Sequence, residues 1–437
     1  MSLEIFRLIV YNLVRIKGER KMAIITDLKA HEILDSRGNP TVYSELVVDN
    51  SIKVWASVPS GASTGLKEAL ELRDDVQTRY DGKGVKRAVT NVNEIIKPAI
   101  IGKELNQELI DAIMIKLDGT ENKSVLGANA ILSVSLCVMK ALAKVQNKEL
   151  YSYLSDGNVS MPLAMMNILN GGMHADNGID IQEFMIVPVL KSIHERVRCG
   201  AEIFHKLNTI LKRKGLQTGL GDEGGYAPKI VSNTEALDLI VDAITKAGYT
   251  PGKNVFIALD VAANSIYDDK LGKYKIDNTY LTRDELISYY KYLINKYPII
   301  SIEDPFEEND LDSLTKLSTI MGSKIMIVGD DYFVTNKRLL ENGIMHNAGN
   351  AILLKANQVG TISEMLETIK LAKEKGYKTI ISHRSGETED TFIADMAVGL
   401  NLGFIKTGSL ARGERIAKYN RLMLIEDELT SKKGKEM

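Results

Sequence analysis

The sequence predicts a two-domain α/β protein, in which a smaller α+β domain precedes a (β/α)8-type barrel. Three observations support this fold class. The chain has 437 residues, which is long for a single ordinary domain. Eight short apolar runs occupy its second part, and most of them alternate with amphipathic helical segments. The pattern changes near Gly157 and Pro162. We therefore expect an extension over 1–21, a capping domain over 22–157 and a catalytic barrel over 158–437.

The first 21 residues are set apart as an upstream extension that is not part of the compact fold. Apolar residues at Ile5, Ile9, Leu13 and Ile16 have roughly helical spacing, with Arg and Lys between them. A membrane-surface helix is one alternative. A signal peptide is less favoured, because the apolar stretch is interrupted and no small-residue cleavage site follows. We expect Met22 to open the compact protein.

The small domain is predicted from three β-type segments followed by helices. The β-type segments are 23–35, 41–50 and 52–59, and turn-rich letters such as DSRGNP separate them. The longest helical segment, 126–145, is apolar on most faces, so we expect it to be buried.

Composition excludes several classes of protein. The formal net charge is −2 and no long basic block occurs, which disfavours nucleic acid as a partner. Cys137 and Cys199 have no close-spaced partner, which argues against a disulfide framework or a cysteine metal site and suits a reducing cytoplasm. No membrane span is expected, because no continuous run of about 18 apolar residues occurs.

The eight apolar runs predict the strands of the barrel. Two come first, MPLAMMNIL and EFMIVPVL, and six follow a long helical stretch: VFIALD, IISIED, IMIVGDD, AILLK, TIISH and GFIKTG. Alternation with helices implies parallel strands, and eight of them close a barrel. An open doubly wound sheet is the alternative, but no Gly-rich phosphate fingerprint follows any of the runs.

Each of the six later runs ends on a polar residue able to do chemistry. These residues are Asp260, Glu303, Asp330, Lys355, His383 and Lys406. In a barrel, the C-terminal strand ends form one rim, where active sites lie. The three carboxylates need a counter-charge, and a hard cation with oxygen ligands, Mg²⁺, suits them. Zinc is disfavoured, because no cysteines or His-x-x-x-His pair accompany them. The alternative is that the carboxylates cap helices or pair with lysines.

The two strand-end lysines suggest a general base. A metal dication nearby would lower the pKa of Lys355 or Lys406 and leave some neutral amine to accept a proton. The same cation would stabilise an enolate formed on a bound carboxylate. The alternative is that both lysines only pair with the carboxylates.

Loop residues complete the predicted site. Arg384 and Ser385 follow a strand end and suit a phosphate or carboxylate group. Glu223 lies between glycines and is read as a general acid for a leaving hydroxyl, although an acidic turn would look the same. His174 lies on a Gly-rich loop, where a satisfied loop histidine is an equal alternative. The remaining candidates are Gln182 and Glu183 at the second run, and Ser63 in a Gly/Ser/Thr-rich loop that is either a lid or a plain connection.

Taken together, the segments resemble the enolase family. The resemblance covers residues from about 22 to Glu426 and is carried, in order, by DSRGNPTV, PSGASTG, LNGGMHADN, QEFMIVP, GDEGGYAP, SIEDPF, LLKANQVGT, SHRSGETED and KTGSLARGERIAKYN. It implies an irregular barrel that begins with two strands and two helices. It also implies Mg²⁺-dependent, reversible dehydration of 2-phosphoglycerate to phosphoenolpyruvate, as in glycolysis and gluconeogenesis.

The resemblance also assigns roles. Asp260, Glu303 and Asp330 match the ligands of one Mg²⁺, and Ser63 matches a ligand of the second, which arrives with substrate. Lys355 matches the base and Glu223 the acid, with Glu183 and His174 beside it. Substrate contacts match Gln182, His383, Arg384, Ser385 and Lys406. Family members are homodimers or homo-octamers, cytoplasmic, with a cell-surface or secreted fraction in some cases.

Departures from the family pattern are few. Tyr332 and Phe333 replace a smaller pair beside Asp330, and Leu66 lies at a variable position. A related acid-sugar dehydratase or cycloisomerase is the alternative enzyme, but none of the six later runs carries Lys-x-Lys. A surface-binding protein that uses the same fold is the alternative from another class.

Overall fold

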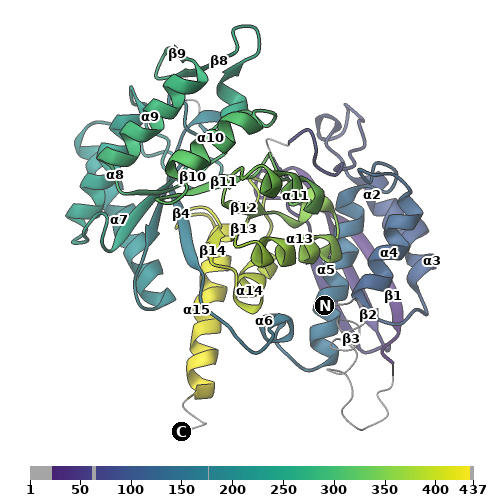
Figure 1. Ribbon diagram of the computed structural model, residues 1–437. Coiled ribbons are helices and arrows are strands. Elements are labelled where there is room, and N and C mark those ends of the chain that lie inside the picture. The colour runs from purple at the N-terminus through teal and green to yellow at the C-terminus, as the bar shows by residue number, and fades with distance from the viewer. Residues whose placement is uncertain (1–21, 62–64, 176, 434–437) are drawn as a thin grey trace.

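A computed structural model describes residues 22–61, 65–175 and 177–433 of the chain (Figure 1). The predicted extension 1–21 and Ser63 lie outside the described residues. An N-terminal α+β part, purple to blue, packs beside a larger barrel whose strands run from teal to yellow (Figure 1). The predicted fold class is confirmed.

The small domain is an antiparallel sheet covered by helices. The sheet has the order β1 (Ile25–Leu34), β2 (Pro40–Val48), β3 (Ile52–Ser57). The helical elements are η1 (Tyr80–Gly82), α2 (Lys86–Thr90), η2 (Asn91–Ile96), α3 (Lys97–Ile100), α4 (Gln107–Asp118), α5 (Ala128–Val145) and α6 (Leu150–Leu154).

The long apolar helix α5 packs on β2 and β3, as its pattern predicts. Among the described residues it is the one helix long and apolar enough to cross a membrane, and 78% of it is buried within the protein. Its Cys137 thiol donates to the carbonyl of Ser44 at 3.2 Å, and both Cys137 and Cys199 are free and buried.

The eight predicted strands close the barrel in the order β10-β11-β12-β13-β14-β4-β5-β6. Their bounds are β4 (Leu163–Asn170), β5 (Glu183–Pro188), β6 (Val255–Asp260), β10 (Ile299–Glu303), β11 (Met326–Gly329), β12 (Ala351–Leu354), β13 (Lys378–Ser382) and β14 (Phe404–Lys406).

The strand β5 is antiparallel to both β4 and β6, unlike the parallel strands expected from the alternation of strands and helices. The order β4, β5, α7 (Ile193–Arg213), α8 (Asn233–Lys246) confirms the irregular start that the family resemblance implies. A loop containing η3 (Gly172–His174) joins β4 to β5, and a connection without a long crossover helix can only reverse the chain. The reversal places the start of β5 at the rim where the other strands end. Glu183 therefore lies opposite Asp260 in the ladder.

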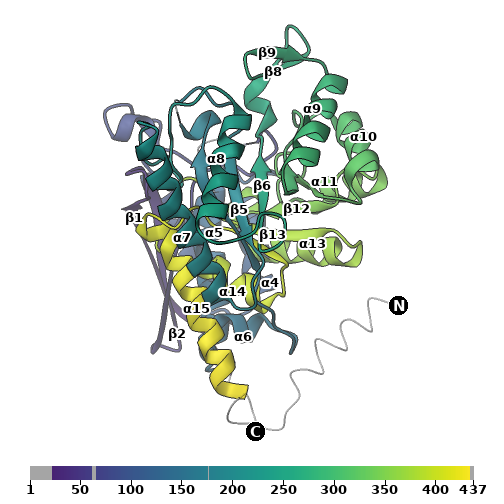
Figure 2. The ribbon, with the colours of Figure 1, turned by 90° about the vertical axis from the view of Figure 1, so that its left-hand side faces the viewer.

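Helices surround the barrel, with α7, α8 and α15 on one side (Figure 2). Ser192, Ser232, Thr282 and Thr361 cap helices by accepting from the N–H of a glutamate three residues later, the S/T-x-x-E pattern. The helical elements are α7 (Ile193–Arg213), α8 (Asn233–Lys246), η4 (Ala263–Ile266), α9 (Arg283–Lys296), α10 (Leu311–Met321), α11 (Lys337–Met345), α12 (Ala356–Val359), α13 (Ile362–Glu374), α14 (Phe392–Gly399) and α15 (Gly413–Lys433).

A small sheet that the apolar runs do not predict follows β6. It comprises β7 (Tyr267–Asp268), β8 (Lys273–Ile276) and β9 (Thr279–Leu281). Asp277 and Asn278, with φ of 47° and 60°, form the tight turn between β8 and β9. An Asp-Asn pair suits two consecutive positive φ angles, so this turn was a readable signal.

The small domain reaches the barrel rim through backbone pairing. Ser60 and Gly386 exchange two N–H···O hydrogen bonds, at 2.7 and 2.8 Å. Arg37, from the turn between β1 and β2, donates to the carbonyl of Gly61 at 3.1 Å and to the hydroxyl of Ser385 at 3.3 Å. The loop after β3 is therefore fixed to the loop after β13.

Candidate active site

A polar cavity lies at the C-terminal rim of the barrel. Eleven of the thirteen predicted site residues line it: His174, Gln182, Glu183, Glu223, Asp260, Asp330, Lys355, His383, Arg384, Ser385 and Lys406. Glu303 is adjacent, since it contacts the Lys406 ammonium. The position of Ser63 is outside the described residues. The closed barrel thus brings residues from His174 to Lys406 to one place.

Lys406 is a buried cation at the centre of the carboxylates. Its Nζ lies 2.8 Å from Asp260 Oδ2, 2.9 Å from both oxygens of Glu303 and 3.1 Å from Glu183 Oε1. Burial lowers the pKa of Lys406, but the surrounding carboxylates outweigh it and hold the pKa well above its usual range. Lys406 therefore acts as a fixed positive charge and is a poor candidate for a base.

Lys355 follows β12 and pairs with Asp330. Burial lowers the pKa of Lys355, but the Asp330 charge, with that of Glu303, raises it above the ordinary value. The lowered pKa predicted from the sequence depends on a bound dication beside Lys355, so it stays a prediction. The carboxylate of Asp330 is itself the counter-charge of Lys355. Both lysines pair with carboxylates, as the alternative reading of the sequence proposes.

Acidic residues that the sequence analysis did not single out extend the carboxylate cluster. Oxygen atoms of Asp304, Asp330 and Asp331 all lie within 4.8 Å of one another, a group that could hold a metal ion. Asp304 has a positive φ of 41° and accepts from the backbone N–H groups of Asp330 at 2.8 Å and Asp331 at 3.0 Å. The signal in the sequence was a pair of consecutive acidic residues, ED and DD, at each of two strand ends.

The donor set suits a hard divalent cation. All of these acidic groups offer carboxylate oxygens, and no described cysteine lies among the lining residues. Burial and the Asp330 charge raise the pKa of Asp331 to about 7, which shows how poorly the lysines alone compensate the cluster. A divalent cation held by Asp260, Glu303 and Asp330 would supply the missing positive charge.

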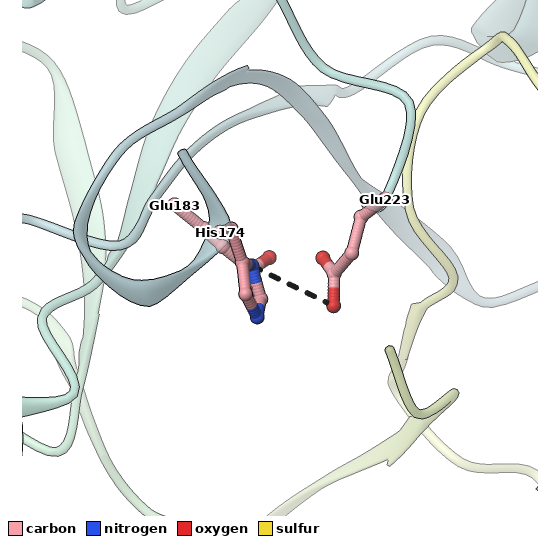
Figure 3. A group of neighbouring side chains, drawn as sticks. All are labelled: His174, Glu183 and Glu223. Atoms are coloured by element: carbon pink, nitrogen blue, oxygen red, sulfur yellow. Dashed lines mark ion pairs between the residues drawn. The ribbon is translucent and has the colours of Figure 1, made fainter. Parts of the chain in front are cut away.

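Glu183, Glu223 and His174 form a second compact group (Figure 3). The Nδ1 atom of His174 is 3.9 Å from an oxygen of each glutamate and has no hydrogen-bond partner. His174 is therefore a buried cavity residue with an unsatisfied nitrogen, rather than a satisfied loop histidine.

The pKa values of Glu183 and Glu223 are shifted in opposite directions. Burial, and then the charge of Glu223, raises the pKa of Glu183 well above its usual range. Burial also acts on Glu223, but His383 and His174 outweigh it and lower the pKa of Glu223 well below its usual range. Two interacting carboxyls pushed apart in this way titrate as a pair. The sequence analysis places the acid at Glu223, and this assignment stays a prediction.

Arg384 forms the cationic end of the cavity. Its Nη1 donates to Glu68 Oε2 at 2.8 Å and to Asn357 Oδ1 at 3.0 Å, and its Nη2 donates to Glu68 Oε1 at 3.2 Å. Ser385 accepts from Arg37. Glu68 and Arg37 belong to the small domain and were missed, because no local pattern reports contacts over more than 300 residues.

The aromatic departure beside Asp330 is accommodated. Tyr332 and Phe333 are buried, and the Phe333 ring lies against Gly329 and Gly343. A Cβ on either glycine would come within 2.5 Å of that ring, so the two glycines make the space for it. Leu66, the variable position, is 86% exposed.

A buried ring of acids, lysines and histidines on a closed eight-stranded barrel defines an α/β-barrel enzyme that works by acid–base chemistry. Two family models match the chain: "Enolase, N-terminal domain" over residues 25–154 and "Enolase, C-terminal TIM barrel domain" over residues 158–435. The chain belongs to the enolase family, which is a family of lyase-type enzymes.

Proposed function

We propose that this protein dehydrates 2-phosphoglycerate reversibly to phosphoenolpyruvate with Mg²⁺ as cofactor. The observation that carries the proposal is that one cavity is lined by two lysines, two neighbouring glutamates and an arginine. A base, an acid and an anion-binding group are what the removal of a proton and a hydroxyl from a phosphorylated acid requires.

Lys355 would take the proton from C2 of the substrate. Asp260, Glu303 and Asp330 would hold Mg²⁺, which supplies positive charge for the enolate that forms on the substrate carboxylate. With Asp330 engaged as a ligand, its hold on the Lys355 proton weakens, and the positive environment favours a neutral amine. Lys406 stays protonated and supports the same negative charge.

The glutamate pair would release the hydroxyl. With Glu223 as the acid, a proton of the pair passes to the C3 hydroxyl, the C3–O bond breaks and water leaves. The electron pair from the C2 carbanion forms the C2–C3 double bond. In the reverse direction, the same pair takes a proton from water.

Arg384, Ser385 and Arg37 favour a phosphate over a neutral group at the other end of the substrate. The Arg384 guanidinium and the Ser385 hydroxyl line the cavity and suit the phosphate of a phosphorylated acid, a group that an acid sugar lacks. Gln182, His174 and His383 line the space between, and a second Mg²⁺ with Ser63 as a ligand belongs to the same proposal.

We further propose a cytoplasmic protein that forms a homodimer or homo-octamer, with a cell-surface or secreted fraction as an additional possibility. Two free, buried cysteines support a reducing compartment. Sedimentation equilibrium of the full chain measures the assembly state.

The test is the rise in ultraviolet absorbance as the enol ester forms. Purified protein with 2-phosphoglycerate and Mg²⁺ should give the rise, EDTA should abolish it, and excess Mg²⁺ should restore it. Glycerate without phosphate should give none. A preparation that binds Mg²⁺ and 2-phosphoglycerate but produces no Mg²⁺-dependent rise would refute the proposal.

A further inference from the structure

Arg415, on α15, is a buried arginine that the proposed chemistry does not use. It is 0% exposed. Its Nη1 lies 2.6 Å from Nδ1 of His383 and 2.6 Å from the carbonyl oxygen of Arg384. Its Nη2 donates to the carbonyl oxygen of Ser385 at 2.5 Å. The buried guanidinium of Arg415 is therefore anchored on the loop that follows β13, and one of its N–H groups points at the imidazole of His383.

The chemistry of the two groups fixes where the imidazole proton lies. A guanidinium has only N–H donors and no acceptor. At 2.6 Å, Nδ1 of His383 must accept, so it carries no proton, and the neutral ring carries its proton on Nε2. Burial agrees with this state, because it lowers the pKa of His383 to about 4.

The second ring nitrogen of His383, Nε2, lies beside Glu223 of the glutamate pair. The Nε2 atom lies 3.3 Å from Glu223 Oε1, a close contact without a hydrogen bond. Gly408 permits this packing: with φ of +79°, a Cβ there would lie 2.8 Å from Arg415 Cδ and 3.1 Å from the His383 ring. Glu223 Oε2 accepts from the amide of Asn167 at 3.1 Å. Glu223 therefore accepts one hydrogen bond, from Asn167, and lies beside the second ring nitrogen of His383.

We propose that Arg415 is a positioning residue that fixes His383 as the Nε2–H tautomer, so that the ring presents an N–H to Glu223 and the cavity. The consequence is that Glu223 meets a ring N–H rather than the lone pair of a bare nitrogen. Arg415 touches no substrate in this scheme. This inference rests on the proposed function for its catalytic consequence, but the tautomer itself does not.

The first measurement is the tautomer of His383 in the full chain. The protein has six histidines, so selective ¹⁵N-histidine labelling gives few signals, and His383→Gln assigns the one of interest. Long-range ¹H–¹⁵N correlation at neutral pH should show Nε2 protonated and Nδ1 bare. A proton on Nδ1, or an imidazolium, would overturn the proposal whatever the activity of the protein.

The second measurement compares variants of α15. Arg415→Met removes the donor, and kcat should fall about 100-fold, with KM changed less than about threefold, while His383 loses its single tautomer. Arg415→Gln keeps an N–H donor and should recover the tautomer and at least about tenfold in kcat. The matched control is Arg421→Met, on the same helix as Arg415. It removes an ion pair with Asp395 of α14 and should leave kcat and the His383 tautomer unchanged.

The outcomes of these measurements distinguish the positioning role of Arg415 from the proposed function. If the Arg415 variants keep kcat within about threefold of the wild type, the positioning role is wrong. If an Arg415 variant does not fold, the spectrum of the wild type still tests the tautomer of His383. Absence of turnover by the wild type would refute the proposed function and leave the tautomer to be judged from its spectrum.

Discussion

The interior of the barrel has two layers, built on the same strands, with opposite chemistry. Along β12 and its end, Ala351, Leu353 and Lys355 are two residues apart and share one face of the strand. The same order, apolar below and charged above, occurs in Phe404 and Lys406. The lower layer is an apolar cluster: Met165, Met185, Val187, Ala258, Met326, Val328, Ala351, Leu353 and Ile380.

The difference between the layers separates stability from function. The apolar layer fills the barrel and gains free energy by leaving water. The charged layer buries several carboxylates and lysines, and burying ions costs free energy even when they are paired. Such a layer is therefore explained by chemistry at the rim. We expect substitutions in the two layers to have different effects.

The largest expected effect is on the acid pair. Glu223→Gln and Glu183→Gln should each lower kcat about 10³-fold, because each removes an ionisable member of a pair that moves one proton. Initial rates from phosphoenolpyruvate absorbance measure this, with the exposed Glu202→Gln as a control. Retention of more than about a tenth of wild-type kcat by either variant would contradict the assignment.

Leu353→Ala tests the apolar layer. The change leaves a cavity under the rim, and the free energy of unfolding should fall by about 3 kcal/mol. Activity of the folded variant should stay within about threefold of the wild type. Urea unfolding followed by circular dichroism, with kcat measured in parallel, gives both numbers. Unchanged stability with lost activity would show that the layers are not separate.

Lowering the pH tests the state of His383, a buried histidine at the rim. The pKa of His383 is lowered to about 4 in the folded protein, from about 6.5 when unfolded. Between these values the unfolded chain binds the extra proton, so stability is lost as pH falls. From pH 7 to pH 5 this group should cost about 2 kcal/mol. Urea unfolding of His383→Gln should show that much less acid sensitivity, and equal pH dependence in both proteins would refute it.

The smallest expected effect is at the cationic end of the cavity. Glu68 now occupies the guanidinium of Arg384, and Glu68→Gln removes a negative charge beside the proposed phosphate site. KM for 2-phosphoglycerate should fall about tenfold or less, with kcat little changed. Glu121→Gln, at an exposed position, is the control. A raised KM would mean that Glu68 orients Arg384 for substrate.

Much of the fold and the rim could be predicted from the sequence, because strand ends in a barrel meet at one rim. A residue such as Lys355 is placed there by the apolar run before it. Pairings across the chain are different: the contacts of Lys406 with three carboxylates depend on which strands are neighbours. The direction of β5, and so the place of Glu183, follows from the loop geometry, which a strand pattern does not contain.

Residues far apart in sequence were missed for the same physical reason. Arg37 reaches Ser385, and Glu68 reaches Arg384, only after the small domain docks on the barrel. Asp304 was missed because its role depends on two backbone N–H groups of the next strand end. Protonation states also need the folded environment, since burial and neighbouring charges decide them together.

The central claim is that Lys355, set above the apolar layer, takes the C2 proton. Exchange of that proton for deuterium, followed by NMR of 2-phosphoglycerate in D₂O with Mg²⁺, tests it directly. The wild type should exchange the C2 hydrogen, whereas Lys355→Ala should show none while still binding Mg²⁺. Exchange by Lys355→Ala at the wild-type rate would contradict the claim and move the base elsewhere on the rim.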